Sequence, residues 1–141
     1  MSPRPAVLLT IALGGMLGAG ARHALDLHVP AWVGFPWATF LANTSGCLLI
    51  GMLMVRLDGG GRAHPLTRPF LGVGLLGGYT TYSTYAVQAS VMLIEERPIV
   101  ALVYLFSTLA AAMLAVVLGV LLARGLTQLP RRPARRREAR P

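Results

Sequence analysis

Nine residues, Gly77 to Tyr85, combine side chains that suit the handling of an ion rather than the inside of a helix. They read Gly-Gly-Tyr-Thr-Thr-Tyr-Ser-Thr-Tyr and lie within an apolar stretch over residues 70–94. A glycine pair, hydroxyls and tyrosines weaken a helix at a depth where a membrane offers the backbone no water. A helix interrupted there frees carbonyls that hold cations and N–H groups that attract anions. The sequence therefore predicts a broken helix lined by protein or ions.

The polar groups inside the apolar stretches are almost all uncharged. No Asp, Glu or Lys lies within the four apolar runs, and Arg22 stands at the end of the first. The remaining groups are hydroxyls, aromatic rings, the amides of Asn43 and Gln88, and backbone groups freed near Gly77 and Gly78. Neutral donors suit an anion that must shed its water, whereas a proton-coupled antiporter needs a buried acid.

Several of these polar residues allow two interpretations. Tyr79, Tyr82 and Tyr85 recur every three residues, so they stack roughly along one helical side. Their ring edges add weak positive potential, but filling space between helices is the simpler explanation of the same spacing. Asn43, and Tyr104 with its neighbouring hydroxyls, can either bond a neighbouring helix or line a permeation path.

The four apolar runs predict an all-α membrane protein with four transmembrane helices, the third broken at its centre. The runs cover residues 6–24, 37–55, 70–94 and 99–123. Of the 141 residues 55% are hydrophobic and 13% charged, where a soluble domain carries about a quarter. The first run also has features of a cleaved signal peptide. Gly14 and Gly18 favour a retained span, because they form a small-residue packing face.

Small residues also predict a close-packing seam along the fourth span. They recur every fourth position, as Ser107, Ala111, Ala115, Gly119 and Ala123. Cys47 is the single cysteine, which excludes an intrachain disulfide and cannot alone build a metal site.

Arginine carries the positive charge and gathers on one side of the predicted membrane. The chain has no lysine, a net charge of +8, and six arginines between Arg131 and Arg140. We expect residues 1–129 to form the transmembrane domain and residues 130–141 to form an Arg- and Pro-rich disordered tail. Anionic membrane lipid is the expected partner of that tail, rather than nucleic acid. The positive-inside rule places both termini in the cytoplasm. We expect the protein in the cell (inner) membrane.

Three motifs resemble those of the Fluc (CrcB) fluoride channel family. Residues 14–22 (Gly-Gly-Met-Leu-Gly-Ala-Gly-Ala-Arg) are similar to the family's Gly-Gly-x-x-Gly-Ala-x-x-Arg. Residues 39–46 (Thr-Phe-Leu-Ala-Asn-Thr-Ser-Gly) resemble its Thr-x-x-x-Asn-x-x-Gly. Residues 77–85 resemble its Gly-Gly-x-Thr-Thr-Phe-Ser-Thr-Phe, the most specific of the three. The resemblance covers roughly residues 14–122.

The resemblance implies a channel that passively exports fluoride from the cytoplasm and so reduces its toxicity. Family members are antiparallel (inverted) dimers with a buried, structural sodium ion at the dimer interface, held by carbonyls that correspond to Gly77 and Thr80. That ion explains how an unwound backbone is tolerated. Arg22 corresponds to a residue near a pore mouth. The implied ion-pathway residues are Asn43, Tyr82, Ser83, Thr84, Tyr85 and Tyr104.

The chain departs from the family pattern in two ways. The family's paired phenylalanines are here Tyr82 and Tyr85, whose hydroxyls need room and a partner. The arginine bias also favours one orientation, whereas an antiparallel homodimer needs both. A heterodimer with an oppositely oriented paralogue is therefore an alternative to a homodimer.

Two other functions remain open on the sequence. A small multidrug-type exporter is also an antiparallel dimer, but that class resembles a pattern with a glutamate in span one, where this chain has no acid from Met1 to Leu25. A non-transporting partner subunit of a heterodimeric channel explains the basic tail but leaves the broken span unexplained. An enzyme is not expected, because no nucleophile, base and metal set converges.

Overall fold

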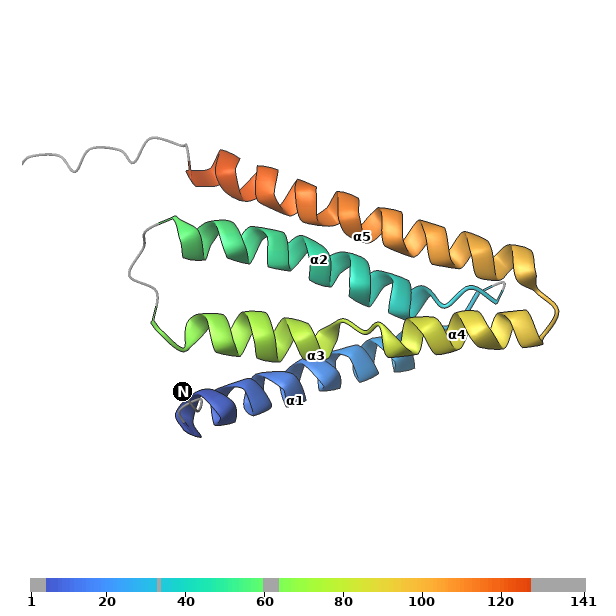
Figure 1. Ribbon diagram of the computed structural model, residues 1–141, viewed down its shortest axis with the longest axis horizontal. Coiled ribbons are helices and arrows are strands. Elements are labelled where there is room, and N and C mark those ends of the chain that lie inside the picture. Colours follow the sequence, from blue (N-terminus) through green and yellow to red (C-terminus); the bar gives the residue numbers. More distant parts are fainter. Residues whose placement is uncertain (1–4, 33, 60–63, 128–141) are drawn as a thin grey trace, which may run out of the picture.

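The regular structure of the chain is helical wherever it is described. The computed structural model describes residues 5–32, 34–59 and 64–127, with no strand in these ranges beyond an isolated bridge between Trp32 and Phe35. The segments are α1 (Pro5–His28), α2 (Trp37–Asp58), η1 (Arg68–Leu76), α3 (Gly77–Tyr79), α4 (Ser83–Ile94) and α5 (Pro98–Thr127) (Figure 1). The predicted all-helical class is confirmed. Arg4, Arg62 and the predicted tail lie outside the described residues.

Three helices, α1, α2 and α5, are long and apolar enough to cross a membrane. They correspond to the first, second and fourth predicted spans, and each ends a few residues beyond its predicted end, at His28, Asp58 and Thr127. Large apolar side chains stay exposed along them, such as Met16 at 64% and Leu114 at 70%. Lipid or another protein must cover so extensive an apolar surface. The chain is therefore a membrane protein.

Glycine contacts join the helices into two groups. α2 packs mainly against α5, whereas α1 packs against η1 and α3. A Cβ atom at Gly18 would overlap with the Leu75 carbonyl, and one at Gly119 would overlap with the Leu48 carbonyl. Only glycine allows the backbones to approach so closely. The packing faces predicted on the first and fourth spans are confirmed.

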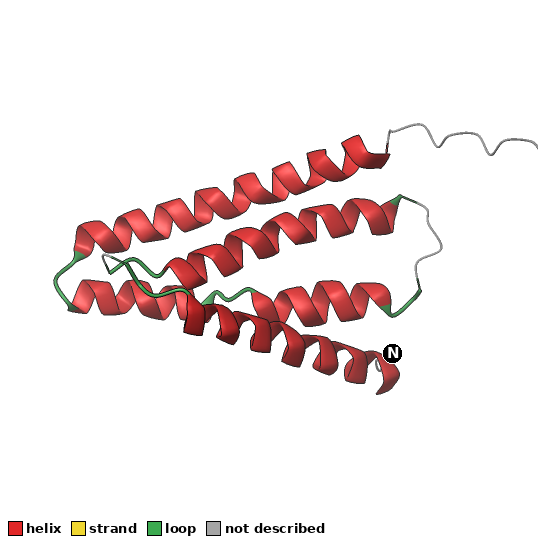
Figure 2. Ribbon diagram, turned by 180° about the vertical axis from the view of Figure 1, so that it is seen from behind, coloured by secondary structure: helices red, strands yellow, loops and turns green. Residues whose placement is uncertain are grey.

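The segments η1, α3 and α4 follow one another end to end, and residues 80–82 between α3 and α4 are not helical (Figures 1 and 2). η1 is a π-helix, a wide form that often occurs at functional sites. Thr80 then adopts an extended conformation, with φ −81° and ψ 156°. The helical hydrogen-bond pattern therefore stops at this point, and the backbone groups around Thr80 need other partners.

Candidate functional site

The side chain of Asn43 on α2 binds the backbone of the interruption. Its Nδ2 donates to the Thr81 carbonyl at 2.9 Å, and its Oδ1 accepts from the Thr81 N–H at 2.8 Å. A backbone N–H can only donate, so this pair of bonds fixes which amide atom faces which group. The second Nδ2 hydrogen remains for another acceptor. Asn43 therefore forms hydrogen bonds to a neighbouring segment, which was one of the two interpretations of this residue. It also keeps one donor, which the other interpretation, a role in a permeation path, requires.

Hydroxyl groups bind the helix ends on both sides of the interruption. The Thr80 hydroxyl donates to the Leu76 carbonyl at 2.9 Å. The Thr81 Oγ1 accepts from the Thr84 N–H at 3.1 Å and donates to the Thr84 Oγ1 at 3.0 Å. The Ser83 Oγ lies 3.3 Å from the Thr81 Oγ1. These bonds cap the start of α4, so Ser83 and Thr84 belong to a hydroxyl cluster that stabilises the interrupted backbone.

Two carbonyls at the interruption lose their helical partners. In a continuous helix the Gly77 carbonyl would accept from the Thr81 N–H, and the Thr80 carbonyl from the Thr84 N–H. Those N–H groups instead donate to Asn43 Oδ1 and Thr81 Oγ1. Within the described ranges no group of three or more His, Cys, Asp or Glu could hold a metal ion. Backbone carbonyls are hard oxygen ligands, so Gly77 and Thr80 fit a small cation such as sodium.

Arg22 on α1 lies beside the same interruption. Its Nε donates to the Gly78 carbonyl at 3.4 Å, a long hydrogen bond. α1 passes so close that a Cβ atom at Gly78 would overlap with the Gly15 carbonyl. The guanidinium thus binds a backbone group at the end of α3. Its position near a pore mouth remains a prediction.

Three tyrosine rings form a row that leads from the interruption into the bundle. The ring centroids of Tyr82 and Tyr85 are 6.0 Å apart, and those of Tyr85 and Tyr104 are 5.2 Å apart. The Tyr85 hydroxyl donates to the Leu105 carbonyl at 2.7 Å, and the Tyr104 hydroxyl donates to Gln88 Oε1 at 2.9 Å. Tyr104 is fully buried, whereas Tyr82 is 81% exposed. The hydroxyl that distinguishes Tyr85 from phenylalanine therefore has its partner within the chain.

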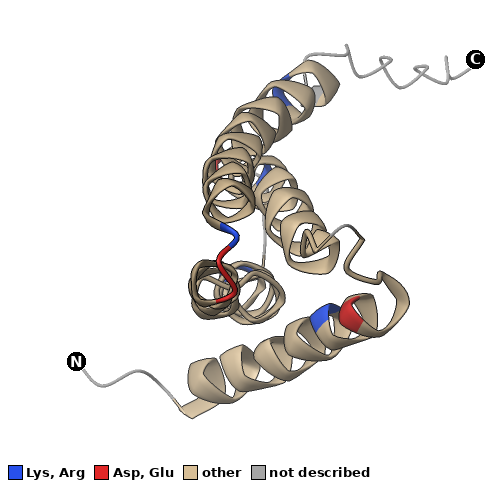
Figure 3. Cartoon of the chain, turned by 90° about the vertical axis from the view of Figure 1, so that its right-hand side faces the viewer, with Lys and Arg blue, Asp and Glu red and all other residues tan. Residues whose placement is uncertain are grey.

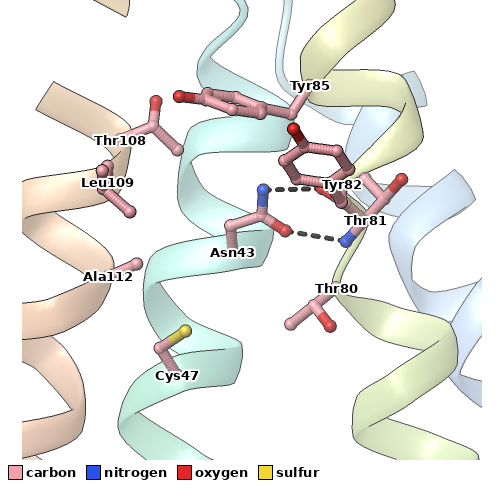
Figure 4. A pocket seen from close by; sticks show the side chains of 9 residues that line it. All are labelled: Asn43, Cys47, Thr80, Thr81, Tyr82, Tyr85, Thr108, Leu109 and Ala112. Atoms are coloured by element: carbon pink, nitrogen blue, oxygen red, sulfur yellow. Dashed lines mark hydrogen bonds between the residues drawn. The ribbon is translucent and has the colours of Figure 1, made fainter. Parts of the chain in front are cut away.

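A cavity of about 260 Å³ opens beside the interruption (Figure 4). Its lining residues are Asn43, Cys47, Thr80, Thr81, Tyr82, Tyr85, Thr108, Leu109 and Ala112. Figure 4 shows the Asn43 amide turned toward Thr81, with the rings of Tyr82 and Tyr85 close by. The cavity therefore brings together an amide, hydroxyls and aromatic rings, which are all uncharged groups.

The lining differs in part from the predicted ion pathway. Ser83, Thr84 and Tyr104 were predicted pathway residues but do not line the cavity, whereas Cys47 and Thr108 do. Cys47 lies one helical turn after the asparagine that binds the interruption, and Thr108 lies one turn after Tyr104. Thr108 is one of the hydroxyls beside Tyr104 that the sequence leaves open as pathway residues, whereas for Cys47 the spacing from Asn43 is the signal that could have identified it. The Thr108 Oγ1 is buried and has no hydrogen-bond partner among the described residues.

Comparison with known proteins identifies the family of the chain. Residues 9–120 match the family of CrcB-like proteins, described as Camphor Resistance (CrcB). The chain is 47% identical over 129 residues to the fluoride-specific ion channel FluC 2 of Nocardia farcinica, covering 91% of this chain and 92% of that one. It is 46% identical over 119 residues to FluC 1 of Streptomyces coelicolor, covering 84% and 77%. It is 40% identical over 112 residues to FluC 2 of Rhodococcus jostii, covering 79% and 94%.

These relatives are ion channels, which confirms that the chain is not an enzyme and that the motif resemblance identified the right family. The family match spans all three motifs, and the Nocardia relative aligns over nearly the whole of both chains. The chain therefore belongs to the CrcB-like family, whose matched members are named fluoride-specific ion channels.

Proposed function

We propose that this chain forms a fluoride-specific channel that passively exports fluoride from the cytoplasm and so limits its toxicity. The cavity beside the interruption carries the proposal, because its described lining offers uncharged donors and no charged side chain. A small anion must replace its water with converging donors, and carboxylates would repel it. The names of the relatives support fluoride as the permeant ion.

The proposed third membrane span consists of η1, α3 and α4. Together with α1, α2 and α5 it completes four spans. The apolar flanks of the interruption support this assignment, as do the bonds from Asn43 and the hydroxyl cluster, because irregular backbone at membrane depth is tolerated only where protein satisfies it.

Fluoride would pass from donor to donor along the tyrosine row. Asn43, Tyr82 and Tyr85 line the cavity, where the second Nδ2 hydrogen of Asn43 and the ring edges of the two tyrosines would face the anion. Ser83 and Thr84 would supply hydroxyl donors once the anion competes with their bonds to the Thr81 Oγ1. Tyr104 would donate last, and the anion must displace Gln88 Oε1 from its hydroxyl.

A structural sodium ion at Gly77 and Thr80 is part of the proposal. The two carbonyls lack their helical partners, and a bound cation would neutralise their partial charge. The ion would stay in place while fluoride moves. Lithium or potassium in place of sodium should lower thermal stability if the carbonyls hold a cation of defined size.

We also propose that two chains assemble as an antiparallel dimer with this cation at the interface. The exposure of Tyr82, 81% in the single chain, supports the proposal, because a pathway ring at membrane depth needs a second wall. Figure 3 shows the charged positions of the described chain, which lie toward helix ends. Arg56, Arg68 and Arg124 lie at the end of the bundle that holds the N-terminus of α1, which would face the cytoplasm.

The charge bias favours one orientation in the membrane, so the orientation of the chain tests which partner it pairs with. Reporter fusions at the C-terminus would show equal populations on both sides of the cell membrane for a homodimer. A single cytoplasmic population would indicate a heterodimer with an oppositely oriented paralogue.

Fluoride efflux from liposomes tests the proposal. Liposomes loaded with potassium fluoride and containing the purified chain should release fluoride once valinomycin carries potassium out, and should retain chloride. No release from the chain alone, but release with a paralogue, would favour the non-transporting subunit. No release in either case would exclude a channel. The family assignment removes the small multidrug-type exporter from consideration.

A further inference from the structure

The connection between α1 and α2 folds back into the bundle as a tight turn. The Phe35 N–H donates to the Trp32 carbonyl at 3.1 Å, and the Trp37 N–H donates to the Phe35 carbonyl at 2.9 Å. Gly34 has φ 73°, a left-handed conformation that glycine adopts without strain. The turn leaves Trp32 76% exposed but places the Phe35 ring, half-buried, against the core.

Phe35 contacts the ring of Tyr104 directly. The two centroids lie 5.3 Å apart at an interplanar angle of 87°, an edge-to-face arrangement. Tyr85 contacts Tyr104 at 5.2 Å. Phe35 is itself supported by Trp37 at 4.6 Å and Phe40 at 5.7 Å. The Tyr104 ring is therefore held between one proposed pathway residue and one residue of the turn.

The side chain of Arg97, in the connection between α4 and α5, lies against the turn. A Cβ atom at Gly34 would overlap with the Arg97 guanidinium, so the guanidinium packs directly on the Gly34 backbone. Arg97 follows α4, and its N–H donates to the Met92 carbonyl at 2.9 Å. The turn between α1 and α2 is thus packed onto the connection between α4 and α5.

The same turn borders the hydroxyl partner of Tyr104. Gln88 lines two cavities of about 290 Å³ each, one beside Pro36 and Trp37 and the other beside Gly34 and Arg97. A tyrosine hydroxyl has no torsion that moves its oxygen independently of the ring. The orientation of the ring therefore sets where the hydroxyl oxygen lies, and rotation of the O–H bond then lets it donate to Gln88 or to an anion within reach.

We infer that Phe35 is a positioning residue for Tyr104, and that the turn at Gly34 and Phe35, packed against Arg97, sets how readily the Tyr104 hydroxyl passes from Gln88 to fluoride. The inference rests on the proposed pathway role of Tyr104. Phe35 does not touch the permeating ion in this account. It acts through the ring that it contacts.

A double-mutant cycle tests the inference in liposomes. Phe35→Leu keeps an apolar side chain but removes the ring, and should lower fluoride efflux about fivefold, the effect expected for one aromatic pair. In a Tyr104→Phe background the same change should alter the remaining efflux by less than about twofold, because the coupled hydroxyl is already absent. Trp32→Leu is the matched control on the exposed side of the turn and should leave efflux unchanged.

The outcomes separate three failures. Equal fold-losses from Phe35→Leu in both backgrounds would make Phe35 a core residue only and overturn the inference. Wild-type efflux from Tyr104→Phe would remove the role of Tyr104, and the inference with it. No efflux from the wild-type chain would instead overturn the proposed function.

If Phe35→Leu does not fold, Gly34→Ala tests the same turn, since it should displace Arg97 and reproduce the loss only when Tyr104 is intact. Gly125→Ala, with nothing within 4 Å of its added Cβ atom, is its control.

Discussion

The α2–α5 pair and the interrupted segment form the hydrogen bonds of their backbones in opposite ways. α5 is one helix of 30 residues, bonded within itself and packed on α2 through glycine. The segment from η1 to α4 stops at residues 80–82 and takes its missing bonds from Asn43 and from threonine hydroxyls. Inside a continuous helix the backbone groups bond one another, whereas the interruption frees carbonyls that an ion can bind. The regular helices therefore supply support and part of the cavity lining, whereas the irregular segment supplies the backbone groups that are open to an ion.

This comparison predicts its largest effect at Asn43. Asn43→Leu leaves both the N–H and the carbonyl of Thr81 without their partner, which should lower stability by about 2–4 kcal/mol and abolish fluoride efflux. Thermal unfolding in detergent and liposome efflux measure the two effects. Thr44→Val is the matched control, because the neighbouring Thr44 hydroxyl is buried without a partner among the described residues. Removing that hydroxyl should change neither stability nor efflux appreciably. Near-normal efflux from Asn43→Leu would contradict the account.

A smaller effect is expected where α1 meets the segment before the interruption. Gly18→Ala adds a Cβ atom that would overlap with the Leu75 carbonyl and lie 2.8 Å from the Tyr79 N–H nitrogen. Separating the backbones should lower stability by about 1–3 kcal/mol. Gly20→Ala is the control on the same helix, since nothing lies within 4 Å of its added atom. Equal melting temperatures for the two variants would refute close packing at Gly18.

The tyrosines should give the smallest effects. Tyr85→Phe removes the bond to the Leu105 carbonyl and should cost about 1 kcal/mol of stability. Fluoride efflux should be preserved or raised, because the ring edge stays at the cavity. Tyr82→Phe should also preserve or raise efflux, with little change in stability, since Tyr82 is largely exposed in the single chain. Loss of efflux in both variants would count against their assignment as ring-edge residues.

Local sequence predicted the helices and the position of the irregular residues, but not how those residues are held. The glycine pair and hydroxyls of residues 77–85 mark the segment that contains the non-helical residues 80–82. The partner of Thr81 lies 38 residues away in the chain, so no local pattern could single it out from the other polar residues of α2. The widened turns of η1 likewise have no periodicity of their own in an apolar stretch.

Arg22 and Phe35 show the same limit. The family resemblance predicts that Arg22 lies near a pore mouth, and no local pattern indicates that its side chain donates to the Gly78 carbonyl. No local pattern around Phe35 indicates that its ring packs on Tyr104, a contact that accompanies the turn at the left-handed Gly34. In both cases the contact forms because two segments that are distant in the sequence pack together. The hydropathy pattern does not indicate which segments will do so.

Cys47 offers the most direct test of the central claim, that fluoride passes through the cavity beside the interruption. It is the single cysteine of the chain and lines that cavity one turn from Asn43. Purified chain should be labelled with a methanethiosulfonate reagent, checked by mass for complete modification and assayed for fluoride efflux beside an equally treated Cys47→Ala control. The account predicts that the labelled chain stops conducting, that the control is unaffected and that a reducing agent restores efflux. Unchanged efflux from fully labelled protein would contradict it.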